Sequence, residues 1–449
     1  MKQLQTFQAS IVALTLLTMI VTAQNCYAQG KGKGGNKGGG SDDGGGETTL
    51  SLPPIAYEVD RVEIYGCSNH YDTSDDHVSV ISFMTEYANE TILTSCNKAA
   101  AIAYMDGSVE FLDNLIDPDL PYDLAAAIGI NNAGQIYCVG YDGVASERRG
   151  FLLIPNPDAE ADGFAYLVEP FPVPNLGEGW TYQVLFSYPN SLNEAGDVLY
   201  KILATSQDGT IRTLQSIRYS DGTIEKLPDS PNENGYTEYV TELNSARTLS
   251  VERSEFDGTT NTFSDYLLFD SGSSRLGIIR DGESFIDDLA DNGFICAQFA
   301  VAAGEEKVKG KWRTIWENRA YFADPLGNEG YTTLRSGMDR RASINEQLIM
   351  GIPPIAGGGE VNTWLVYPGY DPAFLTELLL DEAELAEFDA LFHWDNPAEP
   401  FSVMSTPRNS DGTVDDLGAP SLFGDLEYVT YPNGLRGHAG FYAIRPVTP

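Results

Sequence analysis

Short apolar and aromatic runs alternate with turn residues along most of the chain. Runs such as "YEVDRVEIYG", "QIYCVG", "GFLLIP", "DVLYKILATS" and "NTWLVYP" have the length of strands and are bounded by Gly, Asn, Asp or Pro. In "TIRTLQSIRYSDGTIEKL", an alternating segment from Ile211 to Tyr219 is followed by Asp221-Gly222, a dipeptide typical of tight hairpins. The pattern therefore predicts an all-β protein built from many short strands.

One segment departs from this pattern. "DPAFLTELLLDEAELAEFDALFHW" places Phe374, Leu378, Leu385, Phe388 and Leu391 at helical spacing with acidic residues opposite. We predict an amphipathic helix inserted over about 372–393. It either covers a face or an edge of the β-structure, or it docks a partner.

A turn with Asn and Gly recurs along the chain. The clearest copy is Ile130-Asn131 followed by Gly134 and an apolar strand. The copies fall at Asn131, Asn193, Asn244, Asn292 and Asn345; the third has Arg247 in place of the glycine, the fourth is shifted and the fifth lacks the glycine. Asn can hydrogen-bond its own backbone in a turn, and Gly accepts a positive φ. A second element, an aromatic residue before a Gly-containing turn, recurs at Tyr104, Tyr219 and Phe269.

Repeats of this length that hold about four strands each are typical of a β-propeller. We predict a β-propeller-like repeat fold of about six blades. The run "YEVDRVEIYG" near the start is expected to pair with "GFYAIRPV" at the end and to close the ring. The alternative is that common turn dipeptides recur by coincidence in a β-rich chain.

These repeats resemble the HAF repeat of bacterial extracellular proteins. The segments that carry the resemblance are "AAAIGINNAGQIYCVGY", "RRGFLLIP" and, near the C-terminus, "HAGFYAIRP" from His438 to Pro446. The resemblance covers most of 100–369 and about the last 15 residues. It implies a secreted, propeller-like repeat domain, with no established catalytic residues to carry over.

The N-terminal segment has the features of an export signal. Lys2 precedes the apolar run Ile11–Val21, and small residues up to Ala28 suit a cleavage site. We expect a signal peptide over 1–28, a disordered Gly-rich linker over 29–52 and the repeat domain over 53–449. The protein is then secreted by a bacterium, to the periplasm, cell surface or medium, with no transmembrane span after cleavage. The alternative is an uncleaved anchor.

Four cysteines remain after that cleavage: Cys67, Cys96, Cys138 and Cys296. An even number in an exported chain permits two disulfides, with three possible pairings. Cys67 with Cys96 is the first candidate because these two lie closest in sequence. The alternative is that some of the four are small buried apolar residues.

The chain carries 65 acidic and 27 basic residues, a net charge of −38. Such a charge argues against nucleic acid and anionic membranes as partners, because both require basic surfaces. It suits cations, cationic polymers or simply a well-solvated surface.

The candidate chemistry is sparse. Asp158, Glu160, Asp162 and Glu169 match the spacing of a calcium loop and are the candidate Ca²⁺ ligands, with an acidic hairpin loop as the alternative. No other cofactor is expected. His70 and His77 lie near three aspartates in "HYDTSDDH", which is either a metal site or a polar loop. No G-x-S-x-G or H-E-x-x-H motif occurs, so no catalytic residue is assigned.

The sequence thus favours a secreted, non-catalytic binding or structural protein, with a polysaccharide or an envelope protein as the expected class of partner. One alternative is a secreted polysaccharide hydrolase or lyase that uses channel carboxylates. Another is a calcium-stabilised adhesion module.

Overall fold

The structure is a computed structural model of the chain. Its described residues are 52–63, 83–84, 92–96, 99–185, 191–227, 237–256, 261–268, 284–290, 293, 295–309, 311–323, 329–335, 343–344, 350–352, 364–367, 373–391, 403–404, 419–425, 428–430, 436–438 and 440–447. They all belong to one unit, Leu50–Pro449, and the remaining unit is Met1–Thr49. The predicted signal peptide and all but the last residue of the predicted linker lie outside the described residues.

The sheet of β6 to β9 shows how the short runs fold. β6 (Tyr122–Ile130), β7 (Ile136–Asp142), β8 (Glu147–Pro155) and β9 (Tyr166–Pro170) pair antiparallel in chain order. Along β7, Cys138 packs in an apolar cluster shared with β3 and β4, whereas Tyr137 packs in a cluster shared with β10 and β11. Because side chains alternate between the two faces of a strand, this sheet lies between two neighbours.

Five further sheets follow the same plan. They are formed by β2 (Phe83–Met84), β3 (Ile92–Cys96), β4 (Ala99–Ala103) and β5 (Val109–Phe111); β10 (Trp180–Leu185), β11 (Val198–Ser206), β12 (Ile211–Arg218) and β13 (Ile224–Lys226); β14 (Thr237–Leu243), β15 (Leu249–Phe256) and β16 (Asn261–Leu268); β17 (Ser284–Leu289), β18 (Ile295–Val308), β19 (Lys311–Ala323) and β20 (Glu329–Arg335); and β21 (Ser343–Ile344), β22 (Met350–Ile352), β23 (Trp364–Val366) and β24 (Ala373–Phe374). The predicted hairpin at Asp221-Gly222 is confirmed as the connection between β12 and β13.

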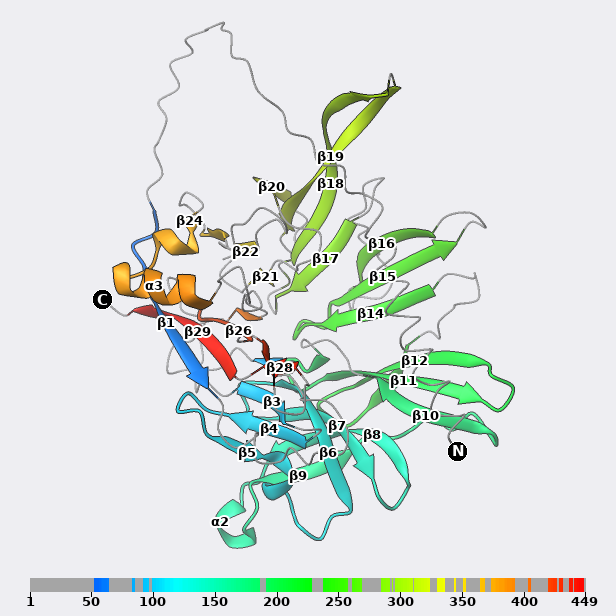
Figure 1. The fold of residues 1–449 in the computed structure, drawn as a ribbon. Helices are drawn as coiled ribbons and strands as arrows, with labels where there is room; N and C mark the ends of the chain where they lie inside the picture. The colour runs from blue at the N-terminus through cyan, green and yellow to red at the C-terminus, as the bar shows by residue number, and fades with distance from the viewer. Residues whose placement is uncertain are drawn as a thin grey trace, which may run out of the picture. The chain divides into compact units, whose positions relative to one another are not determined.

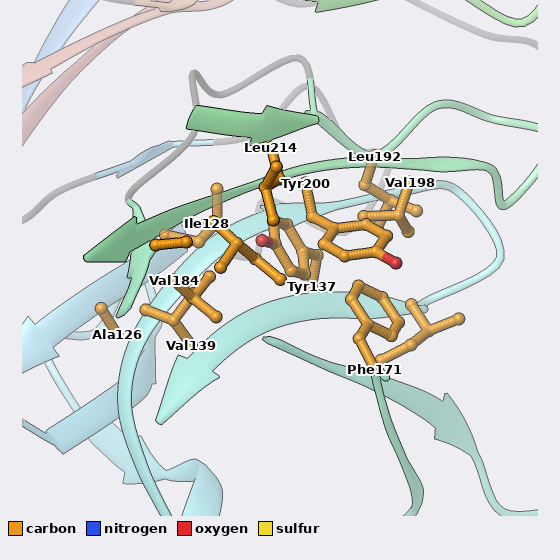
Figure 2. Close-up of a cluster of buried hydrophobic side chains, with 13 residues drawn as sticks. Ala126, Ile128, Tyr137, Val139, Phe171, Val184, Leu192, Val198, Tyr200 and Leu214 are labelled. Atoms are coloured by element: carbon orange, nitrogen blue, oxygen red, sulfur yellow. The ribbon is translucent and has the colours of Figure 1, made fainter. Parts of the chain in front are cut away.

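Aromatic side chains fill the core between the sheet of β6–β9 and the sheet of β10–β13. Figure 2 shows Phe171 close to both Tyr137 and Tyr200 in this cluster. The ring of Phe171 is stacked on Tyr137, with centroids 5.6 Å apart, and is tilted against Tyr200 at 5.0 Å. All three rings are buried, and each such ring is a large apolar contribution to the joint between two sheets.

The two ends of the described chain meet in one sheet. β1 (Ala56–Glu63) pairs antiparallel with β29 (Gly440–Val447), which continues through β26 (Leu422–Asp425) to β25 (Val403–Met404). The register runs from Ala56 opposite Val447 to Glu63 opposite Gly440. The predicted pairing of the first and last strands is therefore confirmed. A further pair, β27 (Tyr428–Thr430) with β28 (Arg436–His438), completes the described strands.

Each sheet packs against the next along the chain. Strand contacts run from β4 with β6, through β8 with β10 and β17 with β21, to β21 with β25. Val62, Phe423 and Phe441 of the closing sheet then pack on Ala103 of the sheet β2–β5. This is a β-propeller, as the sequence predicted (Figure 1). The described residues form seven sheets of three or four strands, where the sequence analysis counted about six blades.

The helical segment covers the free edge of β1. It consists of a 3₁₀ turn, η5 (Leu375–Glu377), and the helix α3 (Glu382–Leu391). The Tyr57 amide donates to the Leu378 carbonyl at 2.7 Å, and the Leu380 amide donates to the Tyr57 carbonyl at 2.8 Å. The Val59 amide donates to the Glu384 carboxylate at 2.6 Å. Of the two roles considered for this segment, these bonds support edge cover.

The helix begins later than predicted. Ala373–Phe374 is strand β24, and the helix starts only after Asp381, whose side chain accepts the amides of Ala383 and Glu384 at 2.8 and 3.1 Å. Asp381 is thus the N-cap, and the apolar residues before it pack as an irregular segment against β1. Within the described part of the chain, no helix has the length and apolar character needed to cross a membrane.

Candidate functional site

The repeated turn makes the same hydrogen bonds in three described copies. The side-chain oxygen of Asn131 accepts the Gln135 amide at 3.0 Å, and the Gly134 amide donates to the Asn131 carbonyl at 2.8 Å. Gly134 has φ 71°, which a glycine adopts without strain. The side chains of Asn193 and Asn244 accept the corresponding amides at 2.8 and 2.7 Å. The local role predicted for Asn and Gly is therefore confirmed.

The same asparagines also join each sheet to the next. Nδ2 of Asn131 donates to the carbonyl of Asn193 at 3.2 Å, and Nδ2 of Asn193 donates to the carbonyl of Asn244 at 3.0 Å. Nδ2 of Asn244 continues the row to the carbonyl of Ala290 at 3.1 Å. The repeat motif therefore has a structural role. The side-chain oxygen of each asparagine accepts a hydrogen bond within its own turn, and the side-chain nitrogen donates one to the next sheet.

The fourth copy has a different register from the one read in the sequence. The Gly293 amide donates to the Ala290 carbonyl at 2.9 Å, which is the bond that Gly134 makes to Asn131. Ala290 therefore holds the asparagine position, and Asn292 is not the repeat residue. The fourth copy keeps the turn but has lost the side chain that would continue the row. The fifth copy, at Asn345, lies outside the described residues.

Arg247 occupies the glycine position of the third copy for an electrostatic reason. It has φ 58°, a strained conformation for a side-chain-bearing residue that costs on the order of 1 kcal/mol. Its Nε lies 3.1 Å from Oδ2 of Asp197, whose side chain has no exposed surface, and its guanidinium lies 4.2 Å from the centre of the Tyr219 ring. Asp197 also accepts the Ser220 amide at 2.7 Å. Arg247 thus neutralises a buried carboxylate, which offsets the strain.

The candidate calcium ligands do not form one group in the structure. Asp158 lies at the start of a single helical turn, α2 (Ala159–Asp162), which includes Glu160. The Asp162 carboxylate accepts the side-chain amide of Asn156 at 3.1 Å. Among the described residues, no cluster of three or more His, Cys, Asp and Glu side chains is arranged to hold a metal ion.

Glu169, the fourth candidate ligand, has a different partner. It lies on β9 and forms a two-bond ion pair with Arg218 of β12, at 2.5 and 3.1 Å. Arg218 is buried, so loss of this carboxylate would leave a buried cation unpaired. The spacing in the sequence matched a calcium loop, but it could not show that a cation from the next sheet takes its last ligand.

The remaining predicted residues lie mostly outside the described part. Cys67, His70 and His77 fall there, as does the side chain of Cys96, so the Cys67–Cys96 disulfide stays a prediction. Cys138 and Cys296 are buried and outside any disulfide, which is the alternative that the sequence left open for some of the four. Burial raises the pKa of the Cys138 thiol, so it acts as a small apolar residue.

In two described copies, the aromatic element forms a side-chain hydrogen bond across a hairpin turn. The Tyr104 hydroxyl donates to Glu110 at 3.0 Å across the β4–β5 turn, and the Tyr219 hydroxyl donates to Glu225 across the β12–β13 turn. Burial and the bond to Glu110 raise the pKa of Tyr104 to about 12. The third copy, at Phe269, lies outside the described residues. This element is also structural.

The far part of the β18–β19 hairpin is a feature that the fold itself does not require. β18 pairs with β17 only over Ile295–Phe299, and β19 pairs with β20 only over Arg319–Ala323. Between these limits β18 and β19 pair, among the described residues, only with each other, up to Val308 opposite Lys311 (Figure 1). This two-stranded ribbon extends on the order of 30 Å beyond the four-stranded part of its sheet. An isolated ribbon adds little stability to a fold, so stability does not explain its length.

The end of this ribbon, Gly304–Thr314, is the candidate functional site. Its described side chains are exposed except that of Val308, which is half-buried, and Trp312 exposes 66% of its surface. Lys307, Lys309, Lys311 and Arg313 gather there, in a chain where acidic residues outnumber basic ones by more than two to one. No motif in the sequence predicted this site. Its signal was "EEKVKGKWRT", the densest basic run outside the Gly-rich linker, with a tryptophan inside it.

Comparisons with known proteins add limited information. No family model and no curated protein matches the chain. A crystal structure of the polysaccharide lyase Uly1 aligns over 89% of this chain and 99% of that one, at 9% identity and a TM-score of 0.47. The β-propeller domain of the trilobed protease from Pyrococcus furiosus, described as having an open velcro topology, covers 74% and 84% at 9% identity and a TM-score of 0.35. The SapL1 lectin, in complex with alpha methyl fucoside, covers 67% and 97% at 12% identity and a TM-score of 0.25. At these values the similarities carry no information about function.

Proposed function

We propose that this chain is an exported, non-catalytic binding protein built on a β-propeller of HAF-type repeats. The observation that carries the proposal is the exposed end of the β18–β19 ribbon, because it is a projecting surface rather than an enclosed one. A projecting ribbon offers contact area to a large partner. It does not supply the enclosed, preorganised site that chemistry on a substrate requires.

Two ion pairs between neighbouring sheets support the same assignment. Asp197 is paired with Arg247, and Glu169 is paired with Arg218. Both carboxylates hold neighbouring sheets together, so neither is poised as a general acid or base. The repeat asparagines are used in the same way.

Two phenylalanines support the HAF-type assignment. Phe151 lies on β8 and Phe441 on β29, the third strands of their sheets, and both are fully buried. They belong to the segments "RRGFLLIP" and "HAGFYAIRP", which carry the resemblance. A Cβ added at Gly150 would lie 2.8 Å from the Phe171 ring, which explains the small residue before Phe151.

Export is tested by fractionating bacterial cells that express the full chain and sequencing the N-terminus of the protein recovered. We expect the protein outside the cytoplasm with Gln29 as its first residue. Recovery from the cytoplasm with Met1 still attached would show that the chain is not exported.

The absence of catalysis is tested separately. The purified protein is incubated with neutral and acidic polysaccharides, and reducing and unsaturated ends are measured over time. We expect no release above a heat-treated sample. Release of either kind of end would replace the binding assignment with the hydrolase or lyase alternative.

A further inference from the structure

We propose that the end of the β18–β19 ribbon binds an acidic polysaccharide, a chain whose sugars carry carboxylate or sulfate groups. This inference rests on the proposed function of an exported binding protein and adds the class of its ligand. The residues that define this ribbon tip are Glu305, Glu306, Lys307, Lys309, Lys311, Trp312, Arg313 and Thr314.

The register distributes the basic groups around the tip. Lys307 lies opposite Trp312, so both belong to one face of the ribbon. Lys311 lies opposite Val308, and Arg313 opposite Glu306, on the other face. Lys309 follows β18 at the turn, with φ 48°. Cations on both faces and at the turn can meet anionic groups that recur along a polymer wrapped over the tip.

Trp312 gives the tip a flat apolar surface beside a cation. Its ring lies 5.8 Å from Nζ of Lys307. Tryptophan is highly buried on average, whereas this ring presents a large apolar area to water. A sugar ring has an apolar face that can stack on the indole, and an acidic substituent on that sugar then lies within reach of Lys307. The pair therefore fits an acidic sugar better than a neutral one.

The length of the ribbon resolves the conflict with the net charge of −38. The body of the protein repels polyanions, but screening at physiological salt falls off over about 8 Å. A tip that extends on the order of 30 Å lies several screening lengths from the rest of its sheet. A thin polysaccharide strand can bind the tip without approaching the acidic body. Duplex nucleic acid and membranes present broad anionic surfaces, which the acidic body of the protein repels. Two copies of this chain also repel each other through their acidic bodies, so neither class of partner fits as well as a thin polysaccharide.

The test measures binding of the full chain to three soluble polymers by affinity electrophoresis: polygalacturonate for carboxylates, dextran sulfate for sulfates and dextran as the neutral reference. One variant removes the tip charges by K307Q, K309Q, K311Q and R313Q together, and a second is W312A. The matched control is V144A with R148Q at the β7–β8 connection, where Val144 is 81% exposed and Arg148 is exposed.

We expect retardation by at least one acidic polymer and none by dextran, with binding that weakens as salt is raised. The charge variant should lose at least about tenfold in affinity and W312A about tenfold, while the control stays within about twofold. Every altered side chain is exposed, so all variants should keep the melting temperature of the unaltered chain.

Three outcomes would overturn the inference. They are no retardation of the unaltered chain by either acidic polymer, equal retardation of the charge variant, or tip-dependent self-association in sedimentation velocity without polymer binding. The last would identify a second copy as the partner. None of these outcomes alters the export and product-release experiments, so the proposed function is judged independently.

Discussion

In three copies of the repeat a side-chain amide connects one sheet to the next, and its removal is testable at Asn193. The N193A substitution removes the acceptor for the Asp197 amide and the donor to the Asn244 carbonyl, at a residue only 4% exposed. Each buried group left without a partner costs about 1–3 kcal/mol. We therefore expect N193A to lower the free energy of unfolding by about 2–4 kcal/mol in urea titrations.

Asn175 provides the control for this prediction. Its side chain accepts the Gly177 amide at 2.8 Å in an exposed turn, so water can replace the lost bond. N175A should change the free energy of unfolding by no more than about 0.5 kcal/mol. Equal effects of N175A and N193A would show that the contact between sheets contributes nothing.

At Arg247 a strained backbone conformation is balanced against an ion pair with Asp197. R247G would relieve the left-handed backbone, a gain of on the order of 1 kcal/mol, but it would leave the buried Asp197 without its cation. Loss of one partner of a buried pair costs about 3–5 kcal/mol, and the 40% exposure of Arg247 reduces this to roughly 1–3. We expect net destabilisation in urea unfolding. A more stable R247G variant would mean that the ion pair does not offset the strain.

At the residue scale the sequence predicted the turns but not their second function. Asn131 and Gly134 were recognised because both residues are present. Ala290 was missed because the sequence offers Asn292 two positions later, and only the backbone hydrogen bond identifies the register. Likewise, the Asp158–Glu169 spacing is one-dimensional, and the arginine that pairs with Glu169 comes from another sheet.

At the scale of elements, the α3 segment protects the edge of β1. E384A removes the acceptor of the Val59 amide but leaves the apolar contacts of Phe388 and Leu391. The Val59 amide should then exchange with solvent deuterium faster, because its bond opens more often. Hydrogen exchange measured by mass spectrometry over the β1 peptide tests this. Asp389 is exposed on the same helix, and D389A should leave the exchange unchanged.

Periodicity located this helix and overestimated its length. Phe374 and Leu378 fit the helical spacing, yet Phe374 belongs to β24 and Leu378 is buried against β1, both outside α3. The better signal was the N-cap at Asp381 with Glu384 three residues later. Periodicity alone cannot separate a helix from an irregular segment that packs one face on a strand.

At the scale of the whole molecule, tyrosines with raised pKa values predict sensitivity to alkali. Burial raises the pKa of Tyr57 well above its ordinary value, and the pKa of Tyr104 is raised to about 12. A raised pKa in the folded state favours the protonated form. The contribution of such a tyrosine to the free energy of unfolding is therefore complete below about pH 10, and it is lost as pH rises towards 12. We expect the free energy of unfolding to fall above about pH 10.

The variant Y104F isolates one of these groups. It lacks the titrating hydroxyl, so urea unfolding at about pH 8 and about pH 11 should show a smaller loss with rising pH than the unaltered chain shows. The control Y141F, at a side chain that is 42% exposed, should leave that loss unchanged. The same loss in Y104F as in the unaltered chain would exclude Tyr104 as a contributor.

The sequence predicted the propeller and its closing pair but undercounted the blades for a physical reason. The repeated turn connects the first and second strands of a sheet, as Asn131 does between β6 and β7. Five copies mark five sheets, and the closing sheet adds one. The sheet β2–β5 precedes the first Asn copy, and only the second repeated element, Tyr104 at the β4–β5 turn, marks it in the sequence.

The pairing of β1 with β29 also sets the order in which the molecule can be completed. Asp60 and Arg445, which form an ion pair in this sheet, are 385 residues apart in the chain. At usual rates of synthesis the ribosome needs roughly 20 to 80 seconds to cover that distance. The sheet that joins the two ends of the described chain stays incomplete throughout this period. A chain terminated before Gly440 leaves β1 as an open edge, and such products are substrates for proteolysis and aggregation.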